Sequence, residues 1–198
     1  MTHQGTVRME TERLILRKFK MEDAGIMFRN WASDDEVTKY LTWPTHTGVD
    51  VTHRVVEEWV KNYSNPDFYN WAIVLKEIGE PIGSISVVKY DEKIASATIG
   101  WCMGKKWWGQ RLMPEAGRAV LKYLFEAVEF NRIAAKHDKN NPRSGRVMQK
   151  IGMVCEGTLR SSGKNNQGII DEVYYSVLKE EYDKNYAQSV KLIWKIES

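Results

Sequence analysis

The chain has 198 residues, of which 42% are hydrophobic and 28% charged, a composition typical of a globular protein that excludes a disordered one. The net charge of +3 suits one anionic small ligand but is too small to indicate a nucleic-acid-binding protein. No apolar stretch approaches the ~20 residues of a membrane span, and the first residues lack the apolar region of an export signal. We therefore expect a cytoplasmic protein with no nucleic-acid or membrane partner.

The spacing of cysteine and histidine indicates no metal or redox site. Cys102 and Cys155 lie far apart without CxxC spacing, which favours buried thiols in a reducing compartment. The four histidines form no HxxxH pattern and no constellation with carboxylates. No metal is expected.

Nothing in the sequence divides the chain. It contains no internal repeat, low-complexity tract or Gly/Ser-rich linker. The sequence therefore predicts one domain over residues 1–198, with a core at about 10–182 and a C-terminal tail at 183–198.

The first half is predicted to form a strand, two helices and three further strands. The first strand covers 12–19, and apolar residues at helical spacing then predict a short helix over 24–31. The stretch Thr47-Gly-Val-Asp50 has capping-box spacing and predicts the start of a second helix. Three apolar runs predict an antiparallel meander at 69–75, 82–88 and 97–103, with the turn Gly79-Glu80-Pro81 between the first two.

The second half begins with the clearest helix of the chain. One apolar stripe runs from Ala116 to Val128, and Pro114 suits the first helical position because its missing N–H costs nothing there. A strand over 132–137 follows. Asn141-Pro142 then predicts a helix with an asparagine cap, which Gly152 ends.

Two last strands are predicted at 154–159 and 169–178, on either side of a turn-rich stretch at 161–168. The tail from Lys179 is predicted to be helical and ends in the basic, apolar stretch 191–195. The resulting order, β-α-α-β-β-β-α-β-α-β-β, does not alternate strictly. It therefore predicts an α+β fold with a mixed sheet flanked by helices.

The stretch from Gly104 to Ala116 is the most informative part of the sequence. A strand ends, a loop with one glycine follows, and an amphipathic helix begins, so unpaired N–H groups gather at the positive end of a helix dipole. Gly109 would let the backbone approach an anion closely, and Lys105 and Lys106 would attract it. The alternative is an ordinary surface turn with solvated lysines. Walker and dinucleotide motifs are absent, which leaves a phosphate cradle of another kind.

Five stretches in order resemble the GNAT superfamily of N-acetyltransferases: Thr11–Arg17, Pro81–Ile85, Ile99–Ala116, Asn141–Met153 and Asp171–Leu178. The resemblance spans about Glu12 to Tyr182 and is closest to the branch of the ribosomal-protein alanine N-acetyltransferases RimJ and RimL. It implies the GNAT fold, a mixed and mostly antiparallel central sheet that splays at its middle to admit acetyl-CoA.

The family's pyrophosphate loop reads [Q/R]-x-x-G-x-[G/A], and Lys106 to Arg111 occupies it here. Gly109 is in place, but Arg111 stands where the family has glycine or alanine. Arg111 would weaken CoA binding if the position is tightly packed, and would pair with a phosphate if it points outward. The resemblance implies these donor-binding residues: Trp101, Cys102, Met103, Lys106, Trp108, Gly109, Gln110, Arg111, Leu112, Met113, Asn141 and Ser144.

The chemistry that the resemblance implies is direct attack of an amine on the thioester of acetyl-CoA. Backbone N–H groups around 101–103 would polarise the acetyl carbonyl, Asn141 would contact the pantetheine arm, and Ser144 would protonate the departing thiolate. Asn141 and Ser144 also have a plainer interpretation, as a helix cap and a first-turn residue. The attacking amine needs a base. The candidates are Asp171, Tyr174, Tyr175 and the pair His137-Asp138.

The acceptor is expected to lie over Tyr40, Trp43 and the second helix, and to be a protein N-terminal α-amine or a small-molecule amine. Two alternatives remain. The first is a CoA-binding protein with weak or no transferase activity, because of Arg111. The second is a nucleic-acid module built on Lys105-Lys106-Trp107-Trp108. Both a monomer and a homodimer are compatible with the sequence.

Overall fold

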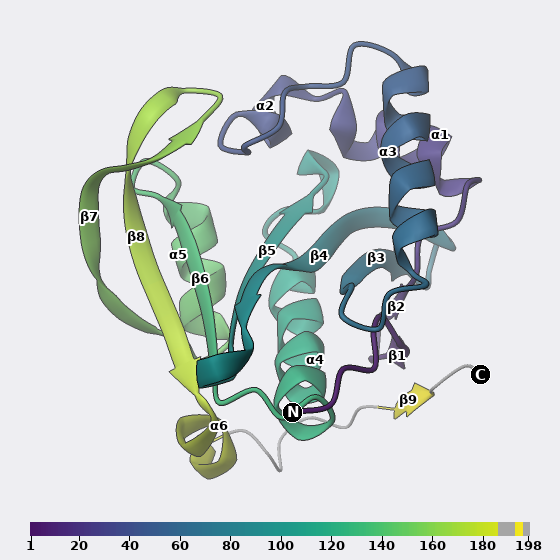
Figure 1. Cartoon of the computed structure of the whole chain (residues 1–198). Helices are drawn as coiled ribbons and strands as arrows, with labels where there is room; N and C mark the ends of the chain where they lie inside the picture. The colour runs from purple at the N-terminus through teal and green to yellow at the C-terminus, as the bar shows by residue number, and fades with distance from the viewer. Residues whose placement is uncertain (186–192, 196–198) are drawn as a thin grey trace.

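A computed structural model describes residues 1–185 and 193–195 of the chain. Its described strands form one nine-stranded sheet in the order β7-β8-β6-β5-β4-β3-β2-β1-β9 (Figure 1). The strands are β1 (Arg8–Glu10), β2 (Leu14–Arg17), β3 (Asn70–Leu75), β4 (Glu80–Asp91), β5 (Ser96–Met103), β6 (Arg132–Asp138), β7 (Val154–Asn165), β8 (Gly168–Leu178) and β9 (Ile193–Lys195). The α-helices are α1 (Asp23–Met27), α2 (Asp35–Thr38), α3 (Val49–Asn62), α4 (Leu112–Glu126), α5 (Pro142–Lys150) and α6 (Lys179–Asn185).

The sheet is splayed between β5 and β6. Within the described residues these two strands form the only parallel pair, and they are in register only over Ser96–Thr98 and Arg132–Ala134. Beyond Thr98, β5 pairs with β4 alone, so its other edge is open. The α+β fold with a mixed, mostly antiparallel and splayed sheet is thereby confirmed.

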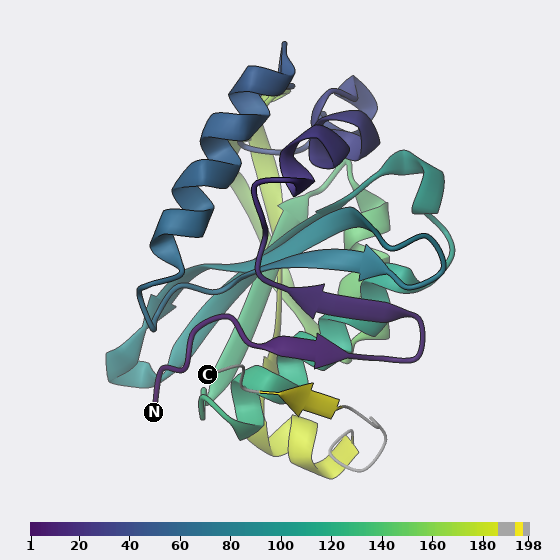
Figure 2. The same cartoon turned by 90° about the vertical axis from the view of Figure 1, so that its right-hand side faces the viewer.

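Helices cover both faces of the sheet (Figures 1 and 2). On one face α4 is buried along most of its length in the main core, where its Ala116, Val120 and Leu124 are fully buried. On the other face α1, a π-helical turn at Phe28–Ala32 and α3 enclose a second core around Trp31. The periodic apolar residues that predicted these helices are therefore the residues that hold the sheet from both sides.

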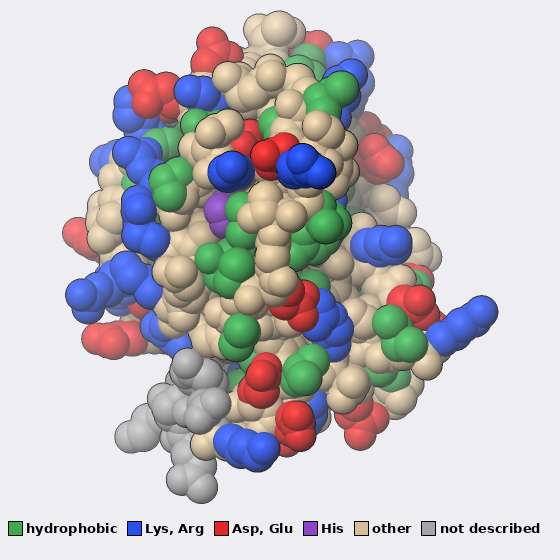
Figure 3. Space-filling model, turned by 90° about the vertical axis from the view of Figure 1, so that its left-hand side faces the viewer, with side chains coloured by type: hydrophobic (Ala, Val, Ile, Leu, Met, Phe, Trp, Pro, Cys, Tyr) green, Lys and Arg blue, Asp and Glu red, His purple; other side chains and the backbone are tan. Residues whose placement is uncertain are grey.

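The edge strand β7 is solvent-exposed along most of its length. Val154, Leu159 and Ile169 of the β7–β8 hairpin are more than half exposed. On the face seen in Figure 3, hydrophobic side chains are interspersed with charged ones. Such interspersed charge is one way in which proteins prevent edge-to-edge association of strands.

The predicted meander, the strand at β6 and the helices at α3, α4 and α5 are confirmed, whereas three local details are wrong. Pro81 lies inside β4, opposite Val74 at a register shift, rather than in a turn. The N-cap of α3 is Gly48, without a side-chain hydrogen bond, so Thr47 does not begin a capping box. Helix α4 begins at Leu112, which places Pro114 at its third position.

The C-terminal part also differs from the expectation. The β7–β8 hairpin is longer than predicted, because β7 continues to Asn165 through the turn-rich stretch. The predicted helical tail begins as α6, which crosses the expected boundary between residues 182 and 183. Residues 193–195 instead form β9, antiparallel to β1, and 186–192 and 196–198 lie outside the described residues. The division into one domain with a tail stays a prediction.

Candidate functional site

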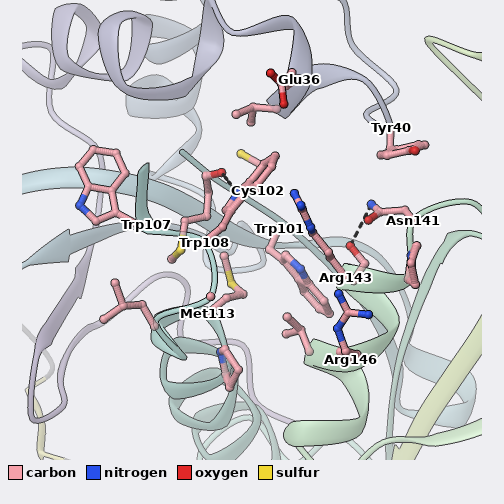
Figure 4. Close-up of a pocket in the computed structure, with 18 of the residues that line it drawn as sticks. Glu36, Tyr40, Trp101, Cys102, Trp107, Trp108, Met113, Asn141, Arg143 and Arg146 are labelled. Carbon is pink, nitrogen blue, oxygen red and sulfur yellow. Dashed lines mark hydrogen bonds between the residues drawn. The ribbon is translucent and has the colours of Figure 1, made fainter. Parts of the chain in front are cut away.

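A cleft of about 790 Å³ lies where β5 and β6 diverge (Figure 4). The start of α4, the start of α5 and the segment around α2 form its walls. Ten residues predicted for the donor site line it: Trp101, Cys102, Met103, Trp108, Gly109, Arg111, Leu112, Met113, Asn141 and Ser144. Lys106 and Gln110 belong to the same loop but are not among the lining residues, and the Gln110 amide donates to the carbonyl of Lys106 at 3.0 Å.

The loop before α4 exposes backbone donors. Gly109 and Arg111 both have left-handed backbone, with φ of 79° and 62°. Among the described residues, none accepts a hydrogen bond from the N–H groups of residues 109–113. The next donor, the N–H of Glu115, bonds to the carbonyl of Arg111 at 3.2 Å. A run of unpaired N–H groups at a helix N-terminus can bind an anion such as a phosphate.

Glu115 fastens this loop to the β1–β2 hairpin. Its carboxylate accepts hydrogen bonds from the hydroxyl of Thr11 at 2.5 Å and from the backbone N–H of Arg13 at 2.9 Å. The Arg13 guanidinium bonds to the same carboxylate at 2.8 Å and to the carbonyl of Gln110 at 3.1 Å. The loop before α4 is therefore held in place by contacts with a part of the chain about 100 residues away in sequence.

Trp108 connects the two walls of the cleft. Its indole N–H donates to the carbonyl of Met103 at 2.7 Å, which ties the loop to the end of β5. From the opposite wall, the guanidinium of Arg143 on α5 lies 4.7 Å from the centre of the Trp108 ring. This cation–π contact keeps a positive charge inside the cleft, and Figure 4 shows Arg143 projecting between the walls.

Cys102 lies on the open edge of β5 with its sulfur 3.3 Å from the hydroxyl of Ser84. Burial raises the pKa of the Cys102 thiol to about 11, so it stays protonated at neutral pH. A protonated thiol is a poor nucleophile. Cys102 therefore lines the cleft, but its protonated thiol is not suited to carry the acyl group in a covalent intermediate.

Asn141 and Ser144 meet at the start of α5. Asn141 is the N-cap residue, as expected, but its side chain forms no capping bond and instead donates to the Ser144 hydroxyl at 3.2 Å. Pro142 occupies the first turn of the helix. Both residues line the cleft, and Figure 4 shows the Asn141 side chain at its edge rather than on the helix end.

The side of the cleft away from the loop is walled by Tyr40 and Leu41. Trp43, also expected at the acceptor side, is not a lining residue, and its ring packs 5.2 Å from that of His46. Among the described residues that line the cleft, Glu36 is the only carboxylate. The ion pair with Lys105 lowers the pKa of Glu36, so its carboxylate is ionised and only weakly basic.

The structure does not bring the predicted base candidates into the cleft. Tyr175 is buried beside the His137 ring, with ring centres 5.7 Å apart, and burial raises the pKa of its hydroxyl. Asp171 accepts a hydrogen bond from the backbone N–H of Ser161 at 2.9 Å. The hydroxyl of Tyr174 donates to Glu172 at 3.0 Å, and Asp138 is buried.

Sequence reasoning missed the cationic face of α5. Arg143, Arg146 and Lys150 all line the cleft. They are spaced at i, i+3 and i+7 on one helix, and this spacing was the signal that could have found them. Within the part of the chain that the structure describes, no group of three or more His, Cys, Asp or Glu side chains could hold a metal ion, and no helix is long and apolar enough to cross a membrane.

Residues 13–154 match the family described as the acetyltransferase (GNAT) domain. An uncharacterized N-acetyltransferase of Bacillus licheniformis, p20, is 34% identical over 173 residues, which is 87% of this chain and 96% of that protein. A solved GNAT-family acetyltransferase from Bacillus anthracis is 31% identical with a TM-score of 0.77, covering 87% of this chain and 99% of that one.

The similarity also reaches the branch expected from the sequence. The [ribosomal protein uS5]-alanine N-acetyltransferase of Escherichia coli is 36% identical over 59 residues, which is 30% of each protein. Together with the splayed sheet and the loop before α4, these matches confirm the RimJ/RimL-like resemblance. The chain belongs to the GNAT family and is an acyl-CoA-dependent N-acetyltransferase.

Proposed function

We propose that the cleft binds acetyl-CoA and a primary amine together, and that the acetyl group passes directly to the amine. The observation that carries this proposal is the run of N–H groups at 109–113 that have no acceptor within the described part of the chain and open into the same cleft as Asn141 and Ser144. The group to be bound is a pyrophosphate, and the donors, the left-handed backbone and the α4 dipole all fit it.

The charges of the cleft suit the rest of the donor. Arg143, Arg146 and Lys150 supply positive charge along one wall, where the phosphates of CoA would be held by side chains as well as by backbone. Acetyl-CoA supplies the acetyl group as a thioester. The open edge of β5 beyond Thr98 offers backbone groups to the arm that carries it.

The transfer forms a bond between the amine nitrogen and the acetyl carbon and breaks the bond between that carbon and sulfur. Ser144, held by Asn141, protonates the departing thiolate, and its position on the first turn of α5 places its hydroxyl on the cleft wall. Asp171 and Tyr175 are not used, because neither lines the cleft. The attacking ammonium first gives up one proton to bulk water. The second proton, which the nitrogen loses on acylation, returns through water to Ser144 after the serine has protonated the thiolate. Glu36, with its lowered pKa, takes neither proton.

The acceptor class is proposed to be a protein N-terminal α-amine or a small-molecule amine. The similarity to an N-acetyltransferase named for the alanine of ribosomal protein uS5 supports the first of these. Tyr40 and Leu41 wall the end of the cleft where the amine would arrive. The cytoplasmic location and the choice between monomer and homodimer stay predictions.

Two measurements test the proposal. Calorimetry with acetyl-CoA is expected to give micromolar binding, and release of free CoA thiol is expected when N-terminal peptides or polyamines are added. Binding without thiol release for any amine would favour the alternative of a CoA-binding protein without transferase activity. No binding up to millimolar acetyl-CoA would refute the proposed function.

A further inference from the structure

The tip of the β7–β8 hairpin is fastened to the segment that follows α2. The backbone N–H of Asn166 donates to the carbonyl of Leu41 at 3.2 Å. The side-chain amide of the same residue donates to the carbonyls of Thr38 at 2.9 Å and Trp43 at 2.8 Å. One residue of the hairpin therefore makes three hydrogen bonds to the backbone of residues 38–43.

A second set of hydrogen bonds, separate from those of Asn166, anchors the hairpin tip to the end of β6. The buried carboxylate of Asp138, at the end of β6, accepts hydrogen bonds from the Asn165 side chain and from the backbone N–H of Asn140, each at 2.8 Å. The Asn165 side chain in turn accepts the backbone N–H of Gln167 at 2.7 Å. These bonds hold the turn in place independently of the bonds that Asn166 makes to residues 38–43.

The two parts that Asn166 joins belong to opposite sides of the splay. The hairpin continues from β6 through β8, whereas the segment at 38–43 follows α2, which lies toward α1 and α3 (Figure 1). Tyr40 and Leu41 of this segment line the cleft, as do Asn140 and Asn141 on the other side. Figure 4 shows Tyr40 and Asn141 at the end of the pocket away from Met113.

We propose that Asn166 is a positioning residue for the acceptor amine. By holding residues 38–43 across the open end of the splay, it fixes the wall against which the amine is placed beside the thioester. This inference rests on the proposed acetyl transfer. Asn166 touches no reacting group itself, and it acts through Tyr40 and Leu41.

The chemistry of the contact requires an amide. Both side-chain acceptors are backbone carbonyls, so the side chain at 166 must donate twice from one nitrogen, as the NH₂ group of asparagine does. A carboxylate of the same shape would bring only acceptors to these carbonyls. Asn166→Asp is therefore the most selective disruption. Asn166→Ala removes the two side-chain bonds and leaves the backbone bond to Leu41, and Asn166→Gln keeps the donor group.

The test compares these three variants with Gln167→Ala, the neighbouring position of the same turn. Among the described residues the Gln167 side chain has no hydrogen-bond partner, and its backbone bond to Asn165 survives the change. For Asn166→Asp and Asn166→Ala we expect kcat/KM for the amine to fall about tenfold, because the side chain no longer donates to the carbonyls of Thr38 and Trp43. The Kd for acetyl-CoA is expected to change less than about twofold.

Hydrogen exchange supplies a readout that needs no turnover. Amides of residues 38–46 are expected to exchange faster in Asn166→Asp and Asn166→Ala, and to stay as in the parent chain in Asn166→Gln and Gln167→Ala. Equal losses of amine kcat/KM and acetyl-CoA affinity, or an unchanged kcat/KM with faster exchange, would overturn the positioning role. Unchanged exchange in all variants would overturn the contact itself.

The two proposals fail in different ways. A parent chain that binds acetyl-CoA but acetylates no amine refutes the proposed function. In that case only the hydrogen-exchange measurement tests whether Asn166 holds residues 38–43 in place. A parent chain that acetylates amines and whose Asn166→Asp variant does so equally well refutes only the positioning role.

Discussion

Arg111 has a side chain at a position where the loop requires left-handed backbone, with φ of 62°. Side chains with a Cβ adopt this region at a cost of roughly 1 kcal/mol, whereas glycine adopts it freely. This explains physically the glycine of the family pattern, whereas alanine at this position would bear the same cost as arginine. The Arg111 side chain is exposed. We therefore expect its left-handed backbone to lower the stability of the folded chain and to leave the shape of the loop at 109–113 unchanged.

Arg111→Gly is therefore expected to raise the free energy of unfolding by up to about 1 kcal/mol, measured by urea denaturation. The Kd for acetyl-CoA is expected to stay the same or to fall, because backbone groups form the cradle. Gln110→Gly is the control, since Gln110 is not among the residues with positive φ and a glycine there should destabilise the chain. A large loss of affinity in Arg111→Gly would show that its guanidinium binds a phosphate.

Ser144→Ala is expected to lower kcat by about tenfold or more while the Kd for acetyl-CoA stays nearly unchanged, because a general acid acts mainly in the transition state. Stopped-flow or steady-state thiol release measures kcat, and calorimetry measures the Kd. The structural alternative, in which Ser144 serves only the first turn of α5, predicts a small loss of stability and no change in kcat. Equal losses of kcat and affinity would refute the role of proton donor.

At the scale of elements, Glu115 joins the first turn of α4 to the β1–β2 hairpin. Burial alone would raise the pKa of its carboxyl, but the hydrogen bonds from Thr11 and Arg13 outweigh burial, so the pKa of Glu115 is lowered from 4.5. A lowered pKa in the folded state means that ionised Glu115 contributes stability above pH 4.5. This contribution is lost as the pH falls through the lowered value.

Glu115→Gln is accordingly expected to cost about 1–3 kcal/mol of unfolding free energy at pH 7, and the difference from the parent chain should shrink below pH 4.5. Urea denaturation across this range measures it. Asp50→Asn is the matched control, because Asp50 pairs with Arg54 on α3 where both side chains are more than 70% exposed. The control should change stability by less than about 0.5 kcal/mol. A pH-independent cost at Glu115 would contradict the assignment.

The same scale shows what the sequence could predict. Apolar runs predicted β3, β4 and β5, and helical periodicity predicted α4, because their apolar residues are largely buried and their order is local. It could not place β1, which has only three residues and takes its partner β9 from the far end of the chain. The short helix α2 has four residues and offered no period to detect, although it carries one wall of the cleft.

The candidate site could be predicted where its residues are contiguous in sequence. It could not be predicted where it joins segments that lie far apart in sequence. The loop from Gly109 to Met113 is contiguous, so its glycine and its helix start indicated an anion site directly. The stack of Arg143 on Trp108 joins residues 35 positions apart, and the bonds of Asn166 to residues 38–43 join segments more than 120 positions apart. Neither pairing leaves a signal in one sequence, because only the splay of β5 from β6 brings the segments together.

At the scale of the whole molecule, one hydrophobic core runs under both sides of the splayed sheet. The contacts that join the two sides directly include three registered residue pairs between β5 and β6, the Trp108–Arg143 stack and the bonds of Asn166. A ligand that contacts both sides would bind the folded chain and not the unfolded one. Its binding would therefore stabilise the fold as a whole.

Acetyl-CoA at a hundred times its Kd is expected to add about 2.7 kcal/mol to the free energy of unfolding, or roughly 5–10 °C to the Tm of a chain of this size. At that fixed ligand concentration the effect should weaken as salt is raised, because the proposed site sets Arg143, Arg146 and Lys150 beside the phosphates at a wall where ions screen charge. Pantetheine, which lacks the phosphates, is the control and should raise the Tm far less at the same concentration. Equal stabilisation by pantetheine and CoA would show that the loop before α4 does not bind the pyrophosphate, since the arm alone would then account for the binding.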